Sequence, residues 1–179
     1  MTTHQDLLLN KITEIVGSTD ESYEARLISM CDDAKRIFIT GAGRSKLVGN
    51  FLGMRLMHSG YTVYVQGEVS TPSIRQGDLL IVISGSGETA QLVSFTNKAK
   101  SEGANVVLVC SKSSSTIGDL ADQTIQIGTD SSFLATKGMP MGTMFELSTL
   151  IFLESIVSHL IHEKGIQEDK MKFRHANME

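Results

Sequence analysis

Short apolar runs alternate with amphipathic segments along this chain, beginning near residue 36. An uninterrupted apolar run indicates a strand that is buried on both faces, as in a parallel sheet whose two sides are covered by helices. On this pattern the sequence predicts five strands, at Arg36–Thr40, Thr62–Val65, Leu79–Ile83, Asn105–Cys110 and Thr124–Ile127.

The segments between these runs carry apolar residues at helical spacing. After the first strand, for example, Leu47, Phe51 and Met54 share one helix face, and Gly60 follows as a terminator. The same reasoning predicts helices at Gln5–Val16, Ser22–Cys31, Lys46–His58, Ala90–Ser101, Thr116–Ala121 and Gly142–His162. Helices that alternate with strands imply crossover connections and a parallel sheet between two helical layers.

We therefore expect an α/β fold, namely a three-layer αβα sandwich with a five-stranded parallel sheet and extra N-terminal helices. No repeat, low-complexity tract or linker interrupts the chain, so a single domain is expected over residues 1–179. Within it we expect N-terminal helices at 1–33, an α/β core at 34–163 and a C-terminal tail at 164–179.

Composition narrows the classes of protein. The net charge of −4 argues against a nucleic-acid partner, and no apolar run approaches the roughly 18 residues that span a bilayer. The first residues lack the basic and apolar regions of a secretory signal. Cys31 and Cys110 lack metal-ligand spacing, and Cys110 ends an apolar run, where a buried thiol is expected. A reducing cytoplasm is the simplest compartment.

The strongest chemical signal follows the third predicted strand. Leu79–Ile83 runs directly into Ser84-Gly85-Ser86-Gly87-Glu88-Thr89, and a predicted helix follows. The glycines allow a sharp turn, and the hydroxyls of Ser84, Ser86 and Thr89 lie beside the free N–H groups of a helix N-terminus. Such a loop suits a phosphate monoester, although a tight turn with serine caps would have the same composition.

A second glycine turn, Gly41-Ala42-Gly43-Arg44-Ser45, follows the first predicted strand. A dinucleotide-binding turn is disfavoured because Lys46 replaces its third glycine, and no Walker sequence follows. What remains is a helix start with a cation and a hydroxyl. Both turns are expected at the carboxyl ends of parallel strands, where they can converge on one phosphorylated small molecule.

These two turns and their spacing resemble the sugar isomerase (SIS) domain family, over the whole chain. Four further segments are similar to the 6-phospho-3-hexuloisomerases of that family: Met54–His58, Leu134–Thr136, Met139–Glu146 and Arg174–Glu179. The resemblance implies a flavodoxin-like fold and interconversion of 3-hexulose 6-phosphate and fructose 6-phosphate in the ribulose monophosphate pathway of formaldehyde fixation. It also implies cooperation with a hexulose-phosphate synthase. Lys46 departs from the small residue that relatives often carry.

Moving a carbonyl from C3 to C2 needs one base and an enediol intermediate, without a cofactor or a metal. Glu146, early in the last long helix, is the candidate base, and the resemblance supports it. The alternative is an acid that stabilises a helix N-terminus by about 0.3–1 kcal/mol. His175 is the second catalytic candidate, acting in trans, although a residue so near the chain end could simply be solvated.

The remaining candidates concern binding and assembly. The predicted substrate site comprises Gly43, Arg44, Ser45, Ser84, Gly85, Ser86, Thr89 and His58. His58 also suits a helix C-terminus as a capping cation. The N-terminal helices and the apolar last helix exceed what one domain needs, which predicts a homo-oligomer, specifically a tetramer. Two alternatives stay open: an SIS isomerase acting on another phosphosugar, and a non-catalytic sugar-phosphate sensor.

Overall fold

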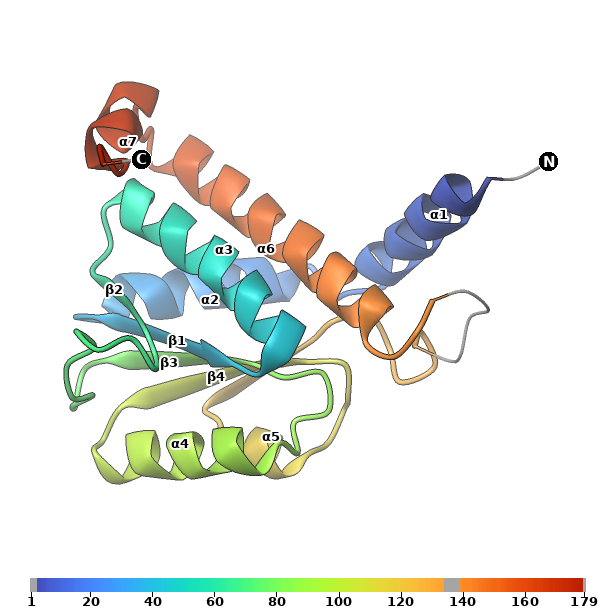
Figure 1. Cartoon of the computed structure of the whole chain (residues 1–179), viewed down its shortest axis with the longest axis horizontal. Coiled ribbons are helices and arrows are strands. Elements are labelled where there is room, and N and C mark those ends of the chain that lie inside the picture. The colour runs from blue at the N-terminus through green and yellow to red at the C-terminus, as the bar shows by residue number, and fades with distance from the viewer. Residues whose placement is uncertain (1–2, 134–138, 179) are drawn as a thin grey trace.

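The computed structural model describes residues 3–133 and 139–178, and within them the chain forms a parallel sheet between two layers of helices (Figure 1). The sheet has five strands in the order β2-β1-β3-β4-β5, and every neighbouring pair is parallel. The strands are β1 (Ile37–Gly41), β2 (Val63–Val65), β3 (Leu79–Ile83), β4 (Asn105–Cys110) and β5 (Gln123–Gln126). This is the flavodoxin-like order, so the expected fold class is confirmed.

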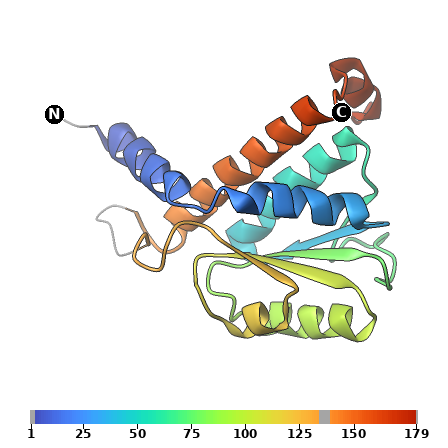
Figure 2. The same ribbon diagram turned by 180° about the vertical axis from the view of Figure 1, so that it is seen from behind.

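The helices cover both faces of the sheet. One face carries α2, α3 and α6, and the other carries α4 and α5 (Figures 1 and 2). Helix α1 contacts α6 and extends away from the sheet. Their bounds are α1 (His4–Gly17), α2 (Ser22–Asp33), α3 (Gly43–Ser59), α4 (Ala90–Ser101), α5 (Thr116–Leu120), α6 (Thr143–Glu163) and α7 (Glu168–Arg174).

The core explains why the strands read as continuous apolar runs. Side chains of β3 alternate between two clusters: Ile81 packs with α3 and α6, and Val82 packs with α4. All five residues of β3 are buried. A central strand between two helical layers therefore needs apolar side chains at every position.

The C-terminal segment differs from the expectation of a tail, because residues 168–174 form the short helix α7. No residue of α7 is buried, so its sequence lacks an apolar face from which a helix could be predicted. It is held instead by a polar contact, in which the Arg174 guanidinium donates to the His58 carbonyl at 3.1 Å.

Helix α6 is long and apolar enough to cross a bilayer by length and composition. Half of that window is buried inside the chain, and the helix packs against α1, α2 and α3. Its buried residues include Phe152, Leu153 and Val157, which belong to the same core cluster as β1 and β3. Helix α6 is therefore apolar because it packs into the core of the layered fold.

Both cysteines are free and buried, as expected for Cys110. Burial raises the pKa of the Cys31 thiol to about 12, and burial also raises the pKa of Cys110. Neither thiol is therefore a ready nucleophile at neutral pH.

Candidate functional site

The loops that follow β1, β3 and β4 lie side by side at the carboxyl edge of the sheet, because these strands are neighbours. They surround a cavity of about 340 Å³. Four predicted site residues line it: Ser45, Gly85, Ser86 and Glu146. The other lining residues are Ser111, Lys112, Phe133, Met141, Gly142 and Phe145. Among the described residues, the cavity thus joins hydroxyls, one carboxylate, one cation and an apolar wall.

The serine loop after β3 is ordered by its own hydroxyls. The Ser84 hydroxyl oxygen accepts from the Gly87 N–H at 3.2 Å and is buried, so Ser84 stabilises the turn rather than lining the cavity. Ser86 is exposed, and its hydroxyl oxygen accepts from the Glu88 N–H at 3.2 Å. Of the three predicted hydroxyls, Ser86 is thus the one that faces the cavity.

Glu88 fastens the same loop to the next helix. Its carboxylate accepts from the Thr116 N–H at 2.8 Å and from the Thr116 hydroxyl at 2.6 Å. These hydrogen bonds lower the pKa of Glu88 below its ordinary value. Thr89 is the N-terminal cap residue of α4, without a side-chain capping bond, and it does not line the cavity.

Glu146 lies in the first turn of α6 and forms an ion pair with Arg44 of the β1–α3 turn. The Arg44 Nε–H donates to Oε2 of the carboxylate. The Glu146 side chain is 12% exposed, against 62% for Arg44. Arg44 therefore borders the candidate base instead of lining the cavity, and Gly43 provides the positive φ of 54° with which α3 begins.

Lys46 makes a structural contact that its position in the sequence does not reveal. Its ammonium donates to the Gln66 carbonyl at 3.0 Å, tying the start of α3 to the loop after β2. Lys46 does not line the cavity.

The two histidine candidates lie at the other end of α3. His58 is buried and stacks on His175, with ring centroids 5.1 Å apart. Because α3 rises about 1.5 Å per residue, His58 lies roughly 22 Å along the helix from Gly43. A second cavity, of about 430 Å³, is lined by Leu47, Asn50, Phe51, Met54, Arg55, His58 and His175. One chain therefore does not bring these histidines to Glu146.

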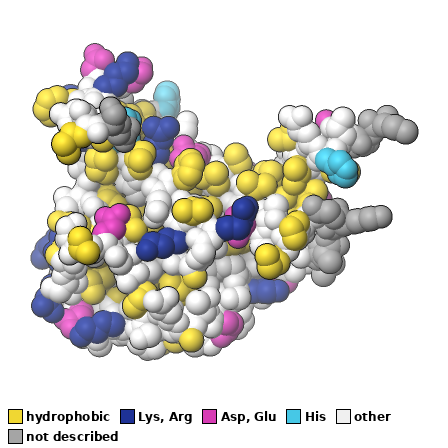
Figure 3. Space-filling view, in the orientation of Figure 1, with side chains coloured by type: hydrophobic (Ala, Val, Ile, Leu, Met, Phe, Trp, Pro, Cys, Tyr) yellow, Lys and Arg dark blue, Asp and Glu magenta, His cyan; other side chains and the backbone are white. Residues whose placement is uncertain are grey.

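The surface over α3 and α6 is rich in apolar side chains (Figure 3). Leu47, Phe51 and Met54 of α3 and Ile151 of α6 are each at least half exposed. By contrast, Ile156, Val157 and Leu160 of α6 are buried within the chain. The apolar surplus expected on the last helix thus comes mainly from α3.

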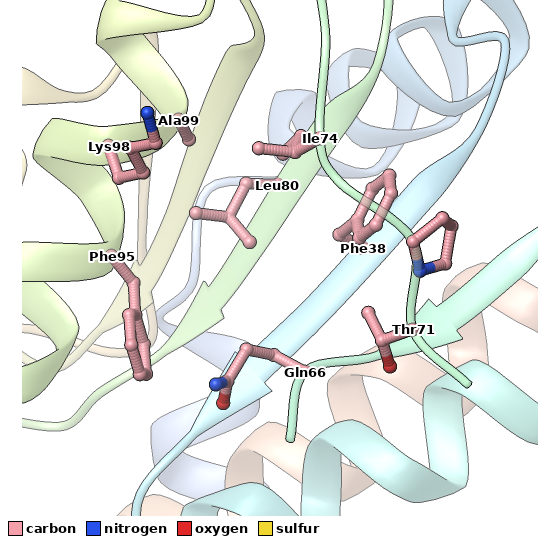
Figure 4. A pocket seen from close by; sticks show the side chains of 9 residues that line it. Phe38, Gln66, Thr71, Ile74, Leu80, Phe95, Lys98 and Ala99 are labelled. Carbon is pink, nitrogen blue, oxygen red and sulfur yellow. The ribbon is translucent and has the colours of Figure 1, made fainter. Parts of the chain in front are cut away.

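A third cavity, of about 170 Å³, lies on the α4 side of the sheet. Figure 4 shows Phe38, Ile74, Leu80 and Phe95 around it, together with the polar Gln66, Thr71 and Lys98. It contains none of the predicted site residues.

Two parts of the resemblance cannot be placed. Residues 134–136 of the Leu134–Thr136 segment and Glu179 of the terminal segment lie outside the described residues. Ser111 and Lys112 were missed in the sequence, although their position directly after the predicted strand Asn105–Cys110 places them at the ligand-binding edge of such a sheet.

A parallel sheet in this order, with serine and glycine loops around a cavity at its carboxyl edge, defines a small-molecule-binding α/β protein. The SIS domain family matches residues 30–152, and the chain belongs to this family. The resemblance found in the sequence is thereby confirmed.

Relatives of similar length are more specific than the family model. The chain is 48% identical over 181 residues to a 3-hexulose-6-phosphate isomerase of Methylomonas aminofaciens, with 100% of both chains covered. It is 39% identical over 176 residues to the Bacillus subtilis enzyme of the same name, covering 96% of this chain and 95% of the relative. A Methanococcus jannaschii protein, whose crystal structure was used to infer a function of 3-hexulose-6-phosphate isomerase, has a TM-score of 0.87 and 34% identity, with 98% of each chain covered.

Proposed function

We propose that this chain is a cofactor-free sugar-phosphate isomerase that interconverts 3-hexulose 6-phosphate and fructose 6-phosphate. The observation that carries the proposal is the cavity that joins the serine loop to Glu146, in a chain whose full-length relatives bear that isomerase's name. Hydroxyl and N–H donors at a helix N-terminus suit the phosphate, and a carboxylate close by suits proton transfer.

Glu146 is the proposed base. In the hexulose-to-fructose direction it removes the C2 proton, while the C3 carbonyl oxygen gains a proton, which gives a 2,3-enediol. The protonated carboxyl then returns its proton to C3, and the C2 hydroxyl loses its proton and becomes the new carbonyl. Overall one proton also passes from the C2 oxygen to the C3 oxygen, and His175 is the candidate for that transfer. One carboxylate that carries a proton between C2 and C3 on one face is sufficient.

The surroundings of Glu146 suit this role. Oε2 accepts from Arg44, and this charge-assisted hydrogen bond fixes the orientation of the carboxylate. Oε1 points to Gly142, where a β-carbon would come within 3.0 Å of it. One carboxylate oxygen is thus anchored, and the other adjoins a cavity-lining glycine that leaves room for substrate.

The decisive variant is Glu146→Gln, which keeps the shape of the side chain and removes its basicity. We expect kcat to fall by about 10²–10⁴-fold while fructose 6-phosphate binding persists. Glu154→Gln is the matched control, because Glu154 lies on the same helix but pairs with Arg55 outside the cavity. A Glu146→Gln enzyme with a near-normal rate would exclude Glu146 as the base.

The proposed enzyme is a homotetramer in which His175 acts in trans. The exposed apolar side chains on α3 supply a face that a second subunit can cover, and the His58–His175 cavity adjoins that face. Light scattering should give four times the chain mass of 19.5 kDa. Co-expressing Glu146→Gln with His175→Ala should restore activity in mixed oligomers. If Glu146 and His175 of the same subunit acted together, the mixed oligomers would stay inactive.

We also infer a cytoplasmic location and metabolic cooperation with a hexulose-phosphate synthase, which would supply the substrate. Two buried free thiols suit a reducing compartment. A synthase-linked flux assay in cell extract, with and without this chain, tests the cooperation.

A further inference from the structure

Lys112 is the one cation among the described residues that line the cavity. Arg44, the cation expected for the phosphate, is paired with Glu146 and lies outside this lining. A sugar phosphate brought into the cavity would therefore meet one carboxylate, several hydroxyls and the Lys112 ammonium.

The backbone at Lys112 is fixed against the serine loop. The Ser111 N–H and hydroxyl both donate to the Gly85 carbonyl, at 3.0 and 2.7 Å. On the other side, the Cys110 thiol donates to the Lys112 carbonyl at 3.1 Å. Because the Ser111 hydroxyl proton is donated to the Gly85 carbonyl, Ser111 positions the loop. The Lys112 ammonium is then the donor that this loop can offer to a ligand.

The Lys112 ammonium is available for an anion. Among the described residues no carboxylate lies within salt-bridge distance of it. The nearby Asp130 accepts from the Ser113 N–H at 3.0 Å and from the Ser113 hydroxyl at 2.6 Å. These bonds lower the pKa of Asp130, and the charge of Lys112 adds a smaller effect. Asp130 therefore attracts the Lys112 ammonium only weakly, and no described carboxylate pairs with it.

The two charged groups that line the cavity come from beside different strands. Glu146 is held by Arg44 beside β1, and Lys112 follows β4, with β3 between the two strands. Neighbouring strands are about 4.8 Å apart, so the loops after β1 and β4 lie roughly 10 Å apart. That separation is comparable to an extended six-carbon sugar phosphate.

We propose that Lys112 is the phosphate-binding cation of this cavity, which orients the substrate with its phosphate between Ser86 and Lys112 and with C2 and C3 at Glu146. This inference rests on the proposed function for the identity of the sugar, but not for the binding of phosphate. Lys112 is then a specificity residue that selects phosphorylated over unphosphorylated sugars.

The test compares Lys112→Met with Lys112→Arg in the full-length chain. Calorimetric titration with inorganic phosphate and with fructose 6-phosphate measures binding without turnover, and KM and kcat are measured separately. Lys98→Met is the matched control, because Lys98 is exposed and its partner Glu102 keeps a second ion pair with Arg75. Lys112 is itself exposed, so its replacement leaves the core intact.

We expect Lys112→Met to weaken both ligands about tenfold or more and to raise KM by more than it lowers kcat, because a charge-assisted hydrogen bond is lost. Lys112→Arg should retain most of the affinity, and Lys98→Met should match the wild type. Unchanged affinity in Lys112→Met, or a wild-type protein that binds neither ligand, overturns the inference. Lys112-dependent phosphate binding without isomerase activity would refute only the proposed reaction.

Discussion

Gly87 occupies the tightest point of the serine loop, and its replacement by alanine tests how that loop is built. Gly87 has a φ of +67°, in the left-handed region, where a side chain costs about 1–2 kcal/mol. A β-carbon there would lie 2.1 Å from the Ser115 hydroxyl oxygen and 2.5 Å from the Ser115 β-carbon. Overpacking of this kind adds about 1–3 kcal/mol. The loss of folding free energy should therefore be about 2–5 kcal/mol.

The assay is thermal unfolding at one protein concentration. In a chain of this size 1 kcal/mol shifts the melting temperature by about 2–4 °C, so Gly87→Ala should lower it by about 4–20 °C. Gly165→Ala is the matched control, because Gly165 has a φ of +58° but nothing within 4 Å of its β-carbon position. It should lose only the backbone contribution, about 1–2 kcal/mol.

A second substitution separates the two contributions further. Adding Ser115→Gly to Gly87→Ala removes the clashing side chain at a capping cost of a few tenths of a kcal/mol. Part of the lost stability should then return. Equal losses in Gly87→Ala and Gly165→Ala, or no recovery in the double variant, would refute the steric reasoning.

Three further predictions concern stability and reactivity. Glu88 has a lowered pKa in the folded state, so its contribution to stability is present above its ordinary pKa of 4.5 and is lost as the pH falls through the lowered pKa. Glu88→Gln should therefore flatten the acid limb of a plot of folding free energy against pH, below about pH 4.5. Arg36→Met leaves the buried Asp78 carboxylate without its two guanidinium hydrogen bonds and should cost about 3–5 kcal/mol in urea unfolding. Cys31, with a pKa of about 12, should resist a thiol reagent in the native protein and react once the chain unfolds, and fast native labelling would contradict its burial.

Much of the fold could be predicted because the strands are buried on both sides. The predicted ranges of β3 and β4 match the structure at both ends. The start of α3 was placed at Lys46, three residues late, because glycine and a turn-like sequence at Gly43 conceal a helical start with positive φ. Helix α7 was missed because it is held by Arg174 and not by an apolar face.

The candidate site was predictable in part, for reasons of topology. Ser45 and Ser86 converge because the ends of neighbouring parallel strands meet at one edge, which the sequence pattern implies. Glu146 of α6 joins them there through its ion pair with Arg44. That Ser84 is used within the loop depends on hydrogen bonds, which no spacing encodes. Lys112 was overlooked because a single lysine after a strand carries no motif.

His58 and His175 lie together, away from the cavity that contains Glu146. Their separation from Glu146 follows from the length of α3, with the serine loops at its N-terminal end and the histidines at its C-terminal end. With 17 residues, α3 spans roughly 25 Å at about 1.5 Å per residue. The resemblance that singles out these histidines is therefore not matched by proximity to Glu146 within one chain.

The most direct test of the account is a coupled assay of the wild-type chain. An added synthase generates 3-hexulose 6-phosphate from formaldehyde and ribulose 5-phosphate, and fructose 6-phosphate is detected through NADPH formation. We expect turnover that depends on this chain. Absence of turnover, with fructose 6-phosphate still raising the melting temperature, would contradict it and point to a sensor or to an isomerase of another sugar phosphate.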